Sequence, residues 1–337
     1  MTASSTFAHI AAMSDEIGTF EHADHVTPRR EHGYCSDDMA RVLVAVCREP
    51  RPTRGVVELG RTAFRFLVAA QGVDGRMRNR RGANGRWSGR RTVEDCWGRS
   101  LSAFGTAARQ APDPWMRQIA MSYFTRGAEQ RSPSPRAMAF AALGAADVLE
   151  VNPRHLPARR VLREAVATIG PVGDDPAWPW PEARLAYANA VLPDALLAAG
   201  HHLDRPDVVA DGLTLLGWLL ERETLDGHLS LTPVGGSGPG DVGVRFDQQP
   251  IEAAAMADAC ARAHALTGDS RWARGVELAA AWFGGANDVG VAMGDVGTGG
   301  GYDGLHVDGV NRNQGTESTL AFITTMQLVG APTPAPA

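Results

Sequence analysis

The sequence contains no lysine, because all 33 residues of the lysine and arginine count are arginine. This absence excludes Schiff-base chemistry, a P-loop lysine and a lysine general base. Only four cysteines occur, and none of them forms a CxxC pair, so neither a zinc site nor a disulfide framework is expected. No stretch approaches the roughly 18 apolar residues that a membrane span requires. We therefore expect no metal, no cofactor and no membrane partner.

The charge balance is acidic, with a formal net charge of -5. This argues against a nucleic-acid partner, which would favour a basic surface. The segment from Arg76 to Arg91 is rich in arginine, which suits either an anion site or pairing with local carboxylates. The N-terminus lacks the basic region and the apolar core of a secretory signal, so we expect a cytoplasmic protein.

Internal repetition is the main feature of the 337-residue chain. Six segments share one plan, in which a short polar or acidic cluster runs directly into a helix rich in alanine and other small residues. Little of each helix surface is polar, so these helices are expected to be buried on most sides. The six segments begin at Gly33, Val93, Ser132, Trp178, Phe246 and Asn311.

Helices of a second kind, amphipathic and more charged, separate these segments. They begin at Thr53, Asp113, Pro157, Pro206 and Ser270. The alternation predicts an all-α fold, an (α/α)6 toroid or barrel with an inner ring of six apolar helices and an outer amphipathic ring. The stretch from Phe7 to Met13 is expected to supply the twelfth helix. Residues 1–330 would form one domain, and the APTPAPA tail at 331–337 would be disordered.

Two long glycine-rich connections interrupt this regularity, one around Gly82 and one from Gly227 to Pro250. Loops of this length in a compact domain are usually functional. Both lead directly into an inner helix, so both are expected on the rim where the inner helices begin.

Acidic residues recur at the starts of the inner helices. Capping explains any one of them, because Asp is favoured at helix N-termini. Their recurrence on five of the six inner helices instead favours a ring of carboxylates around one funnel. They are Asp37, Asp38, Glu94, Asp95, Glu182, Asp247, Glu252 and Glu317.

Aromatic, amide and arginine side chains accompany these acids in the sequence. Aromatic faces beside polar groups are what a carbohydrate site requires, although tryptophan is also an ordinary core residue. The expected substrate contacts besides the acids are Tyr34, Trp87, Trp97, Arg99, Trp178, Trp180, Gln248, Gln249, Asn313 and Gln314. The pattern predicts an oligosaccharide or polysaccharide as the partner.

Glycoside hydrolysis needs two carboxyl groups, one protonated and one ionised. Glu252 lies one turn inside an apolar helix, where burial would raise its pKa and suit it to the role of acid. Asp37 is the preferred base, with Asp38, Asp95, Asp247 and Glu317 in reserve. Acids on opposite walls of a wide funnel would stand about 6.5–9.5 Å apart, the spacing of an inverting enzyme.

Several long motifs carry a family resemblance. HGYCSDDMAR, EDCWGR, WPWPEARLAYANA, FDQQPIEAAAMADA and DGVNRNQGTESTLAF resemble an actinobacterial family of (α/α)6-barrel glycoside hydrolases, and most of all the methylmannose polysaccharide hydrolases of mycobacteria. The resemblance implies an endo-acting mannosidase that cleaves α-1,4-linked 3-O-methylmannose polysaccharide into shorter oligomannosides. It also implies a catalytic aspartate in YCSDD and a catalytic glutamate in QQPIE, at Asp37 and Glu252. Cys96 departs from the pattern, since relatives more often carry tryptophan there.

Two other functions stay open. A sugar epimerase on the same fold would use histidines as acid and base, and His32, His228 and His306 lie in candidate rim segments. A non-catalytic carbohydrate-binding domain accompanying a glycosyltransferase would bind sugar without turnover. A homodimer is also open, because the run from Leu215 to Leu219 is either core or a subunit contact.

Overall fold

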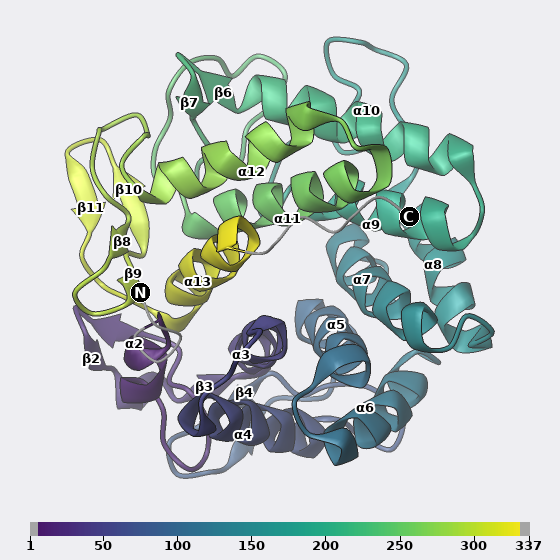
Figure 1. Ribbon diagram of the computed structural model, residues 1–337, viewed down its shortest axis with the longest axis vertical. Coiled ribbons are helices and arrows are strands. Elements are labelled where there is room, and N and C mark those ends of the chain that lie inside the picture. The colour runs from purple at the N-terminus through teal and green to yellow at the C-terminus, as the bar shows by residue number, and fades with distance from the viewer. Residues whose placement is uncertain (1–5, 331–337) are drawn as a thin grey trace.

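Two concentric rings of helices make up the computed structural model, which describes residues 6–330 (Figure 1). The predicted tail at 331–337 lies outside the described residues. Inner and outer helices alternate along the chain, as the sequence predicts. The inner helices are α3 (Ser36–Arg48), α5 (Asp95–Gln110), α7 (Pro135–Val151), α9 (Val191–His202), α11 (Pro250–Thr267) and α13 (Thr316–Gly330). The outer helices are α2 (Ala8–Ala12), α4 (Arg54–Ala70), α6 (Pro114–Gly127), α8 (Leu156–Ile169), α10 (Pro206–Arg222) and α12 (Ser270–Phe283).

The inner ring is closed, because each inner helix packs against the next and α13 returns to α3. The short helix α2 contacts α13 and α4, and so completes the outer ring. The predicted all-α (α/α)6 architecture is therefore confirmed. None of the helices in residues 6–330 is long and apolar enough to cross a membrane.

Small residues allow α5 and α7 to pack at backbone contact. A Cβ placed on Gly105 would lie 2.1 Å from the carbonyl oxygen of Gly144, and one placed on Gly144 would lie 2.2 Å from that of Leu101. Either distance is a severe clash. The glycines and alanines of the inner helices therefore set the width of the inner ring at this point.

The outer helices bury one face against the inner ring. Thr53 caps α4 by accepting the backbone N–H of Val56, and Asp269 caps α12 in the same manner at Arg271. On α10, Leu215, Leu216 and Leu219 are fully buried. That face therefore belongs to the core and is not a free surface for a second subunit.

Short antiparallel strands lie along the rim at which the inner helices begin. β3 (Tyr34–Cys35), β4 (Arg80–Arg81) and β5 (Trp87–Ser88) form a three-stranded sheet in which Cys35 pairs with Arg80. Four two-stranded hairpins complete the set: β1 (Ala23–Asp24) with β2 (Thr27–Pro28), β6 (Thr224–Leu225) with β7 (His228–Leu229), β8 (Gly294–Asp295) with β9 (Gly300–Gly301), and β10 (Gly304–His306) with β11 (Gly309–Asn311). Strands β4 and β5 lie in the glycine-rich connection around Gly82, and β7 lies in the connection from Gly227 to Pro250.

Two features of the rim differ from the sequence prediction. Helix α9 begins only at Val191, whereas the sequence pattern runs WPWPE straight into the helix. Pro179 and Pro181 keep that segment extended, and the side chain of Asn189 holds the turn before α9 by accepting the N–H of Ala186. The other difference is the segment 284–315, which forms β8 to β11 and had no predicted structure.

Candidate active site

A polar cavity of about 420 Å³ opens at the N-terminal ends of the inner helices. The first turns of α3, α5 and α13 bring four of the predicted acids to its wall, together with Arg99 and Gln249. Those acids are Asp37, Asp38, Asp95 and Glu317. Residues from distant parts of the chain meet here because the inner helices all run in one direction around the ring.

Asp37 has an incompletely satisfied carboxylate. Its side chain is 18% exposed, and its Oδ1 atom lies 3.6 Å from Nε of Arg99. That oxygen is buried and has no hydrogen-bond partner within residues 6–330. Burial raises the pKa of Asp37, against the opposing charges of Arg99 and Arg41. Buried polar atoms without a partner are uncommon, so this oxygen marks Asp37 as a functional candidate.

Asp38 lies beside Asp37 but is fully engaged. Its Oδ1 accepts a hydrogen bond from Nη1 of Arg41 at 2.8 Å, and its Oδ2 accepts one from the thiol of Cys35 at 3.2 Å. Arg41 also pairs with Glu317 of α13. Burial raises the pKa of Asp38 to about 6 despite the charge of Arg41. Asp38 therefore holds the Arg41 guanidinium in place, and Arg41 in turn positions Glu317.

Asp95 belongs to a chain of polar contacts that spans the cavity wall. Tyr187 donates its hydroxyl to Oδ2 of Asp95 at 2.6 Å. The guanidinium of Arg136 lies 5.0 Å from the centre of the Tyr187 ring and donates to the Tyr187 carbonyl. Nη1 of Arg136 contacts both oxygens of Glu182, at 2.7 and 2.9 Å. Glu182 thus supports the wall from behind.

Glu252 occupies the first turn of α11 and is 4% exposed. Its Oε1 accepts the backbone N–H of Ala188 at 2.5 Å, and its Oε2 accepts both the backbone N–H and the side-chain Nδ2 of Asn189 at 3.1 Å. Burial raises its pKa to about 8, and the neighbouring charge of Glu223 adds to the shift. The turn that it holds contributes Tyr187 to the cavity wall.

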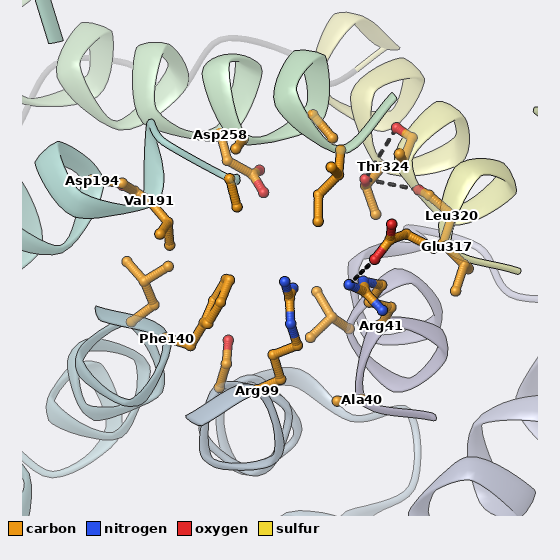
Figure 2. Close-up of a pocket in the computed structure, with 18 of the residues that line it drawn as sticks. Ala40, Arg41, Arg99, Phe140, Val191, Asp194, Asp258, Glu317, Leu320 and Thr324 are labelled. Carbon is orange, nitrogen blue, oxygen red and sulfur yellow. Dashed lines mark hydrogen bonds and ion pairs between the residues drawn. The ribbon is translucent and has the colours of Figure 1, made fainter. Parts of the chain in front are cut away.

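Beneath the polar cavity lies a smaller, largely apolar chamber of about 130 Å³ (Figure 2). Arg41, Arg99 and Glu317 line both spaces and form the boundary between them. The guanidinium of Arg99 lies 3.9 Å from the centre of the Phe140 ring, which supports it from one side. A ligand in the polar cavity therefore meets a floor of two arginines and one glutamate.

Five of the predicted substrate contacts are buried away from the cavity wall, namely Tyr34, Trp97, Trp180, Gln248 and Gln314. Each has an internal role. The indole of Trp97 donates to the carbonyl of Gly127, and the hydroxyl of Tyr34 donates to Asp15. These side chains stabilise the rim, and they have no exposed face for a sugar.

The remaining predicted contacts are more open but lie outside the cavity wall. Trp87 packs on Phe66, and Trp178 packs on Trp218 of the outer helix α10. Asp247 is half-exposed and lies 3.4 Å from His306. Asn313 accepts the backbone N–H of His25 through its side chain. None of these four residues lines the cavity.

Sequence reasoning missed several residues of the cavity wall, including Glu21, His22, Arg41, Tyr187 and Asp303. Arg41 carried a usable signal, since it lies one turn after Asp38 on the same helix face. His22 and Asp303 lie in irregular segments, where no helical period marks a position. Of the histidines considered for epimerisation, His228 pairs with Asp288 at 3.0 Å, and His32 packs edge-on against His22.

One set of donor atoms in the cavity has the spacing of a metal site, formed by Glu21, Cys35 and Asp38. The fit is poor. Burial raises the pKa of the Cys35 thiol well above its usual value, and the thiol donates to Asp38. A metal ligand would have to be the thiolate.

No protein-family model matches the chain, and no curated protein matches it significantly. Solved structures match it over nearly its whole length. A sugar epimerase from a ruminal bacterium has a TM-score of 0.70 and 10% identity, and the match covers 98% of this chain and 100% of that one. A D-mannose isomerase has a TM-score of 0.67 and 11% identity, with 97% and 96% covered. An alpha-amylase from Clostridium perfringens has a TM-score of 0.61 and 11% identity, with 97% and 98% covered.

These likenesses establish the fold. A sugar epimerase, a D-mannose isomerase and an alpha-amylase share this barrel. The reaction of the present protein must therefore be argued from its own cavity.

Proposed function

We propose that the protein is a glycoside hydrolase. The observation that carries the proposal is the polar cavity at the N-terminal rim, where Asp37 and Asp95 lie in one wall with a floor of Arg41 and Arg99. Carboxyl groups supply both the acid and the base of glycoside hydrolysis, and arginines suit hydroxyl groups of a sugar. The reaction requires no cofactor.

Asp37 is the proposed base. Its side chain lines the cavity and is 18% exposed, and Arg99 at 3.6 Å favours the ionised form that a base requires. The pKa of Asp37 is raised and so lies closer to neutral pH than that of an exposed aspartate. This makes its carboxylate a stronger base.

Glu252 is the proposed acid. A pKa of about 8 keeps this carboxyl group protonated at neutral pH, which is the state needed to protonate a leaving oxygen. Its contacts with Ala188 and Asn189 place it behind the turn that carries Tyr187. In this proposal, substrate binding displaces the turn, and the bound sugar replaces it in shielding Glu252 from water, so the carboxyl group keeps its proton until it reacts. Asp95 is the alternative acid, because it already lines the wall.

The finer proposal concerns the substrate. We infer an endo-acting mannosidase that cleaves α-1,4-linked 3-O-methylmannose polysaccharide into shorter oligomannosides with inversion. The support is the motif resemblance around Asp37 and Glu252, and a polar cavity of about 420 Å³ beside Asp37. The expected separation of the two acids, about 6.5–9.5 Å, would leave room for a water.

A panel of α- and β-linked mannans and methylmannans tests the proposal, with product length read by mass spectrometry. Defined short oligosaccharides from an α-1,4-linked substrate are expected, whereas mannose alone would contradict endo action. Asp37→Asn should bind the same substrate without cleaving it. If the unsubstituted protein binds the polymer and leaves it intact, the protein is a carbohydrate-binding module.

Epimerisation is the second candidate, favoured by one observation. His22 lines the cavity, and burial lowers its pKa, so its imidazole is neutral and able to act as a base at neutral pH. The sugar epimerase among the structural matches adds support for this reaction.

A further inference from the structure

The far rim of the barrel, where the inner helices end, carries a second cluster of reactive side chains. His201 and His202 are the last two residues of α9, and Glu150 is the penultimate residue of the adjacent helix α7. Two imidazoles and one carboxylate, all from helix ends, thus meet on one patch. One ligand atom from each of the three lies within 4.8 Å of those from the other two.

The distance between two of the three donor atoms matches that of two ligands on one zinc ion. Nε2 of His202 lies 3.4 Å from Oε1 of Glu150. Two ligand atoms bound to one zinc ion at about 2.0–2.1 Å in a tetrahedral arrangement stand roughly 3.4 Å apart. The rings of His201 and His202 have centroids 5.0 Å apart and an interplanar angle of 71°, so they do not block one another by stacking.

The electrostatic surroundings also favour a cation. Two helix C-termini converge on the cluster, and the negative end of each helix dipole stabilises positive charge. The nearby arginines are already paired, because Arg262 donates to Asp194 at 2.5 Å and Arg109 donates to Asp147 at 2.9 Å.

We propose that Glu150, His201 and His202 form a divalent transition-metal site with zinc as the preferred ion. Two imidazoles and a carboxylate are a common zinc donor set, and the fourth position would hold water. Helix α9 is 12 residues long, which separates the cluster from the sugar cavity by roughly 18 Å. The ion would therefore clamp α7 to α9 and would take no part in the reaction.

The test is zinc titration of the full chain, produced without a histidine tag and dialysed against a chelator. Calorimetry is expected to show one Zn²⁺ bound per chain, and zinc is expected to raise the melting temperature. His202→Gln and Glu150→Gln should each weaken binding at least about tenfold, since even second-shell changes at metal sites cost that much. His264→Gln is the matched control, because His264 lies near the C-terminal end of another inner helix, α11, and bonds to the carbonyl of Asp269.

The outcomes are distinct. Failure to bind zinc at a 1:1 ratio, or equal affinity in His202→Gln and the unsubstituted protein, would show that the cluster is only an ion pair between two helix ends. Saccharide cleavage is expected to be the same with and without zinc. A failed titration therefore leaves the hydrolase proposal standing, and a failed hydrolase proposal leaves this site standing.

Discussion

The carboxylate of Glu252 accepts the backbone N–H groups of Ala188 and Asn189, although Asn189 is 63 residues away in the sequence. Ala188 has a φ of 45°, a left-handed conformation that costs an L residue roughly 1–3 kcal/mol. Both hydrogen bonds stabilise this strained turn. The same turn presents Tyr187 to the cavity that Asp37 lines. The hydrogen bonds of Glu252 therefore help to fix the position of Tyr187 in the cavity wall.

Glu252→Gln is expected to flatten the pH dependence of stability. The pKa of Glu252 is about 8 in the folded protein and about 4.3 in an unfolded chain. Its contribution to stability is therefore complete below about pH 4.3 and is lost as the pH rises through about 8. The unfolding free energy, measured by urea denaturation from pH 5 to 8, should fall less steeply in the variant, by up to about 1.4 kcal/mol per pH unit.

The control for this series is Glu221→Gln, because the side chain of Glu221 is 78% exposed. Its stability profile should match that of the unsubstituted protein. Asp38 and Glu223 also have raised pKa values, about 6 and about 7, so part of the slope will persist in Glu252→Gln. An unchanged slope in Glu252→Gln would contradict the burial of a protonated glutamate.

Tyr187→Phe is expected to impair the reaction and to leave the fold intact. The phenyl ring keeps its packing beside Arg136, but the hydroxyl that donates to Asp95 is lost. A hydrogen bond to a charged group contributes about 1.5–3 kcal/mol, which corresponds to a roughly 10- to 100-fold loss in kcat/KM. Tyr123→Phe on the outer helix α6 serves as the comparison. Equal kcat/KM in both variants would show that the hydrogen bond between Tyr187 and Asp95 plays no part in the reaction.

His22→Asn separates hydrolysis from epimerisation. The hydrolase proposal assigns proton transfer to carboxyl groups, so this variant should retain most of its activity, while Asp37→Asn should lose about 10²- to 10⁴-fold in kcat. The assay is reducing-end release from an α-1,4-linked methylmannan. The reverse order, with His22 essential and Asp37 dispensable, would favour the epimerase.

Gly105→Ala is expected to destabilise the barrel, because the new Cβ would lie 2.1 Å from the backbone oxygen of Gly144. Overpacking of this kind costs about 1–3 kcal/mol. Gly55→Ala on α4 is a matched substitution, since the nearest atom to its Cβ would lie 3.9 Å away. Thermal unfolding of both variants checks the prediction. Comparable melting temperatures would mean that α5 and α7 are not in backbone contact.

The fold was predictable because its signal is local and repeated. Apolar and amphipathic helices alternate along the chain, and each helix carries its own 3.6-residue period. No long-range information is needed for such a prediction. The outer helix α10 shows the limit of this signal, since its period left Leu215 and Leu219 open as core or subunit contact, and the structure buries both.

The candidate site was only partly predictable. Asp37, Asp95 and Glu317 could be placed together because parallel inner helices bring their first turns to one rim. The segment 284–315 folds through distant contacts, such as the paired backbone groups of Gln248 and Leu305, and so it carried no local signal.

Tryptophan was the weakest guide to the site. Trp97 and Trp180 occur beside acidic residues in the sequence, yet both are buried. A large apolar ring next to a carboxylate suits either a sugar platform or the core beneath a rim, and sequence proximity does not distinguish the two. Only the three-dimensional packing, such as the indole of Trp97 bonded to the carbonyl of Gly127, decides between them.

The most direct test of the hydrolase account is the anomeric form of the first product, followed by proton NMR as the protein cleaves an α-1,4-linked methylmannan. Acid and base on opposite sides of the bond predict short oligosaccharides whose new reducing ends appear first in the β form and then mutarotate. New reducing ends that appear first in the α form would contradict the two-carboxylate inverting mechanism. An uncleaved polymer would contradict the proposed function itself.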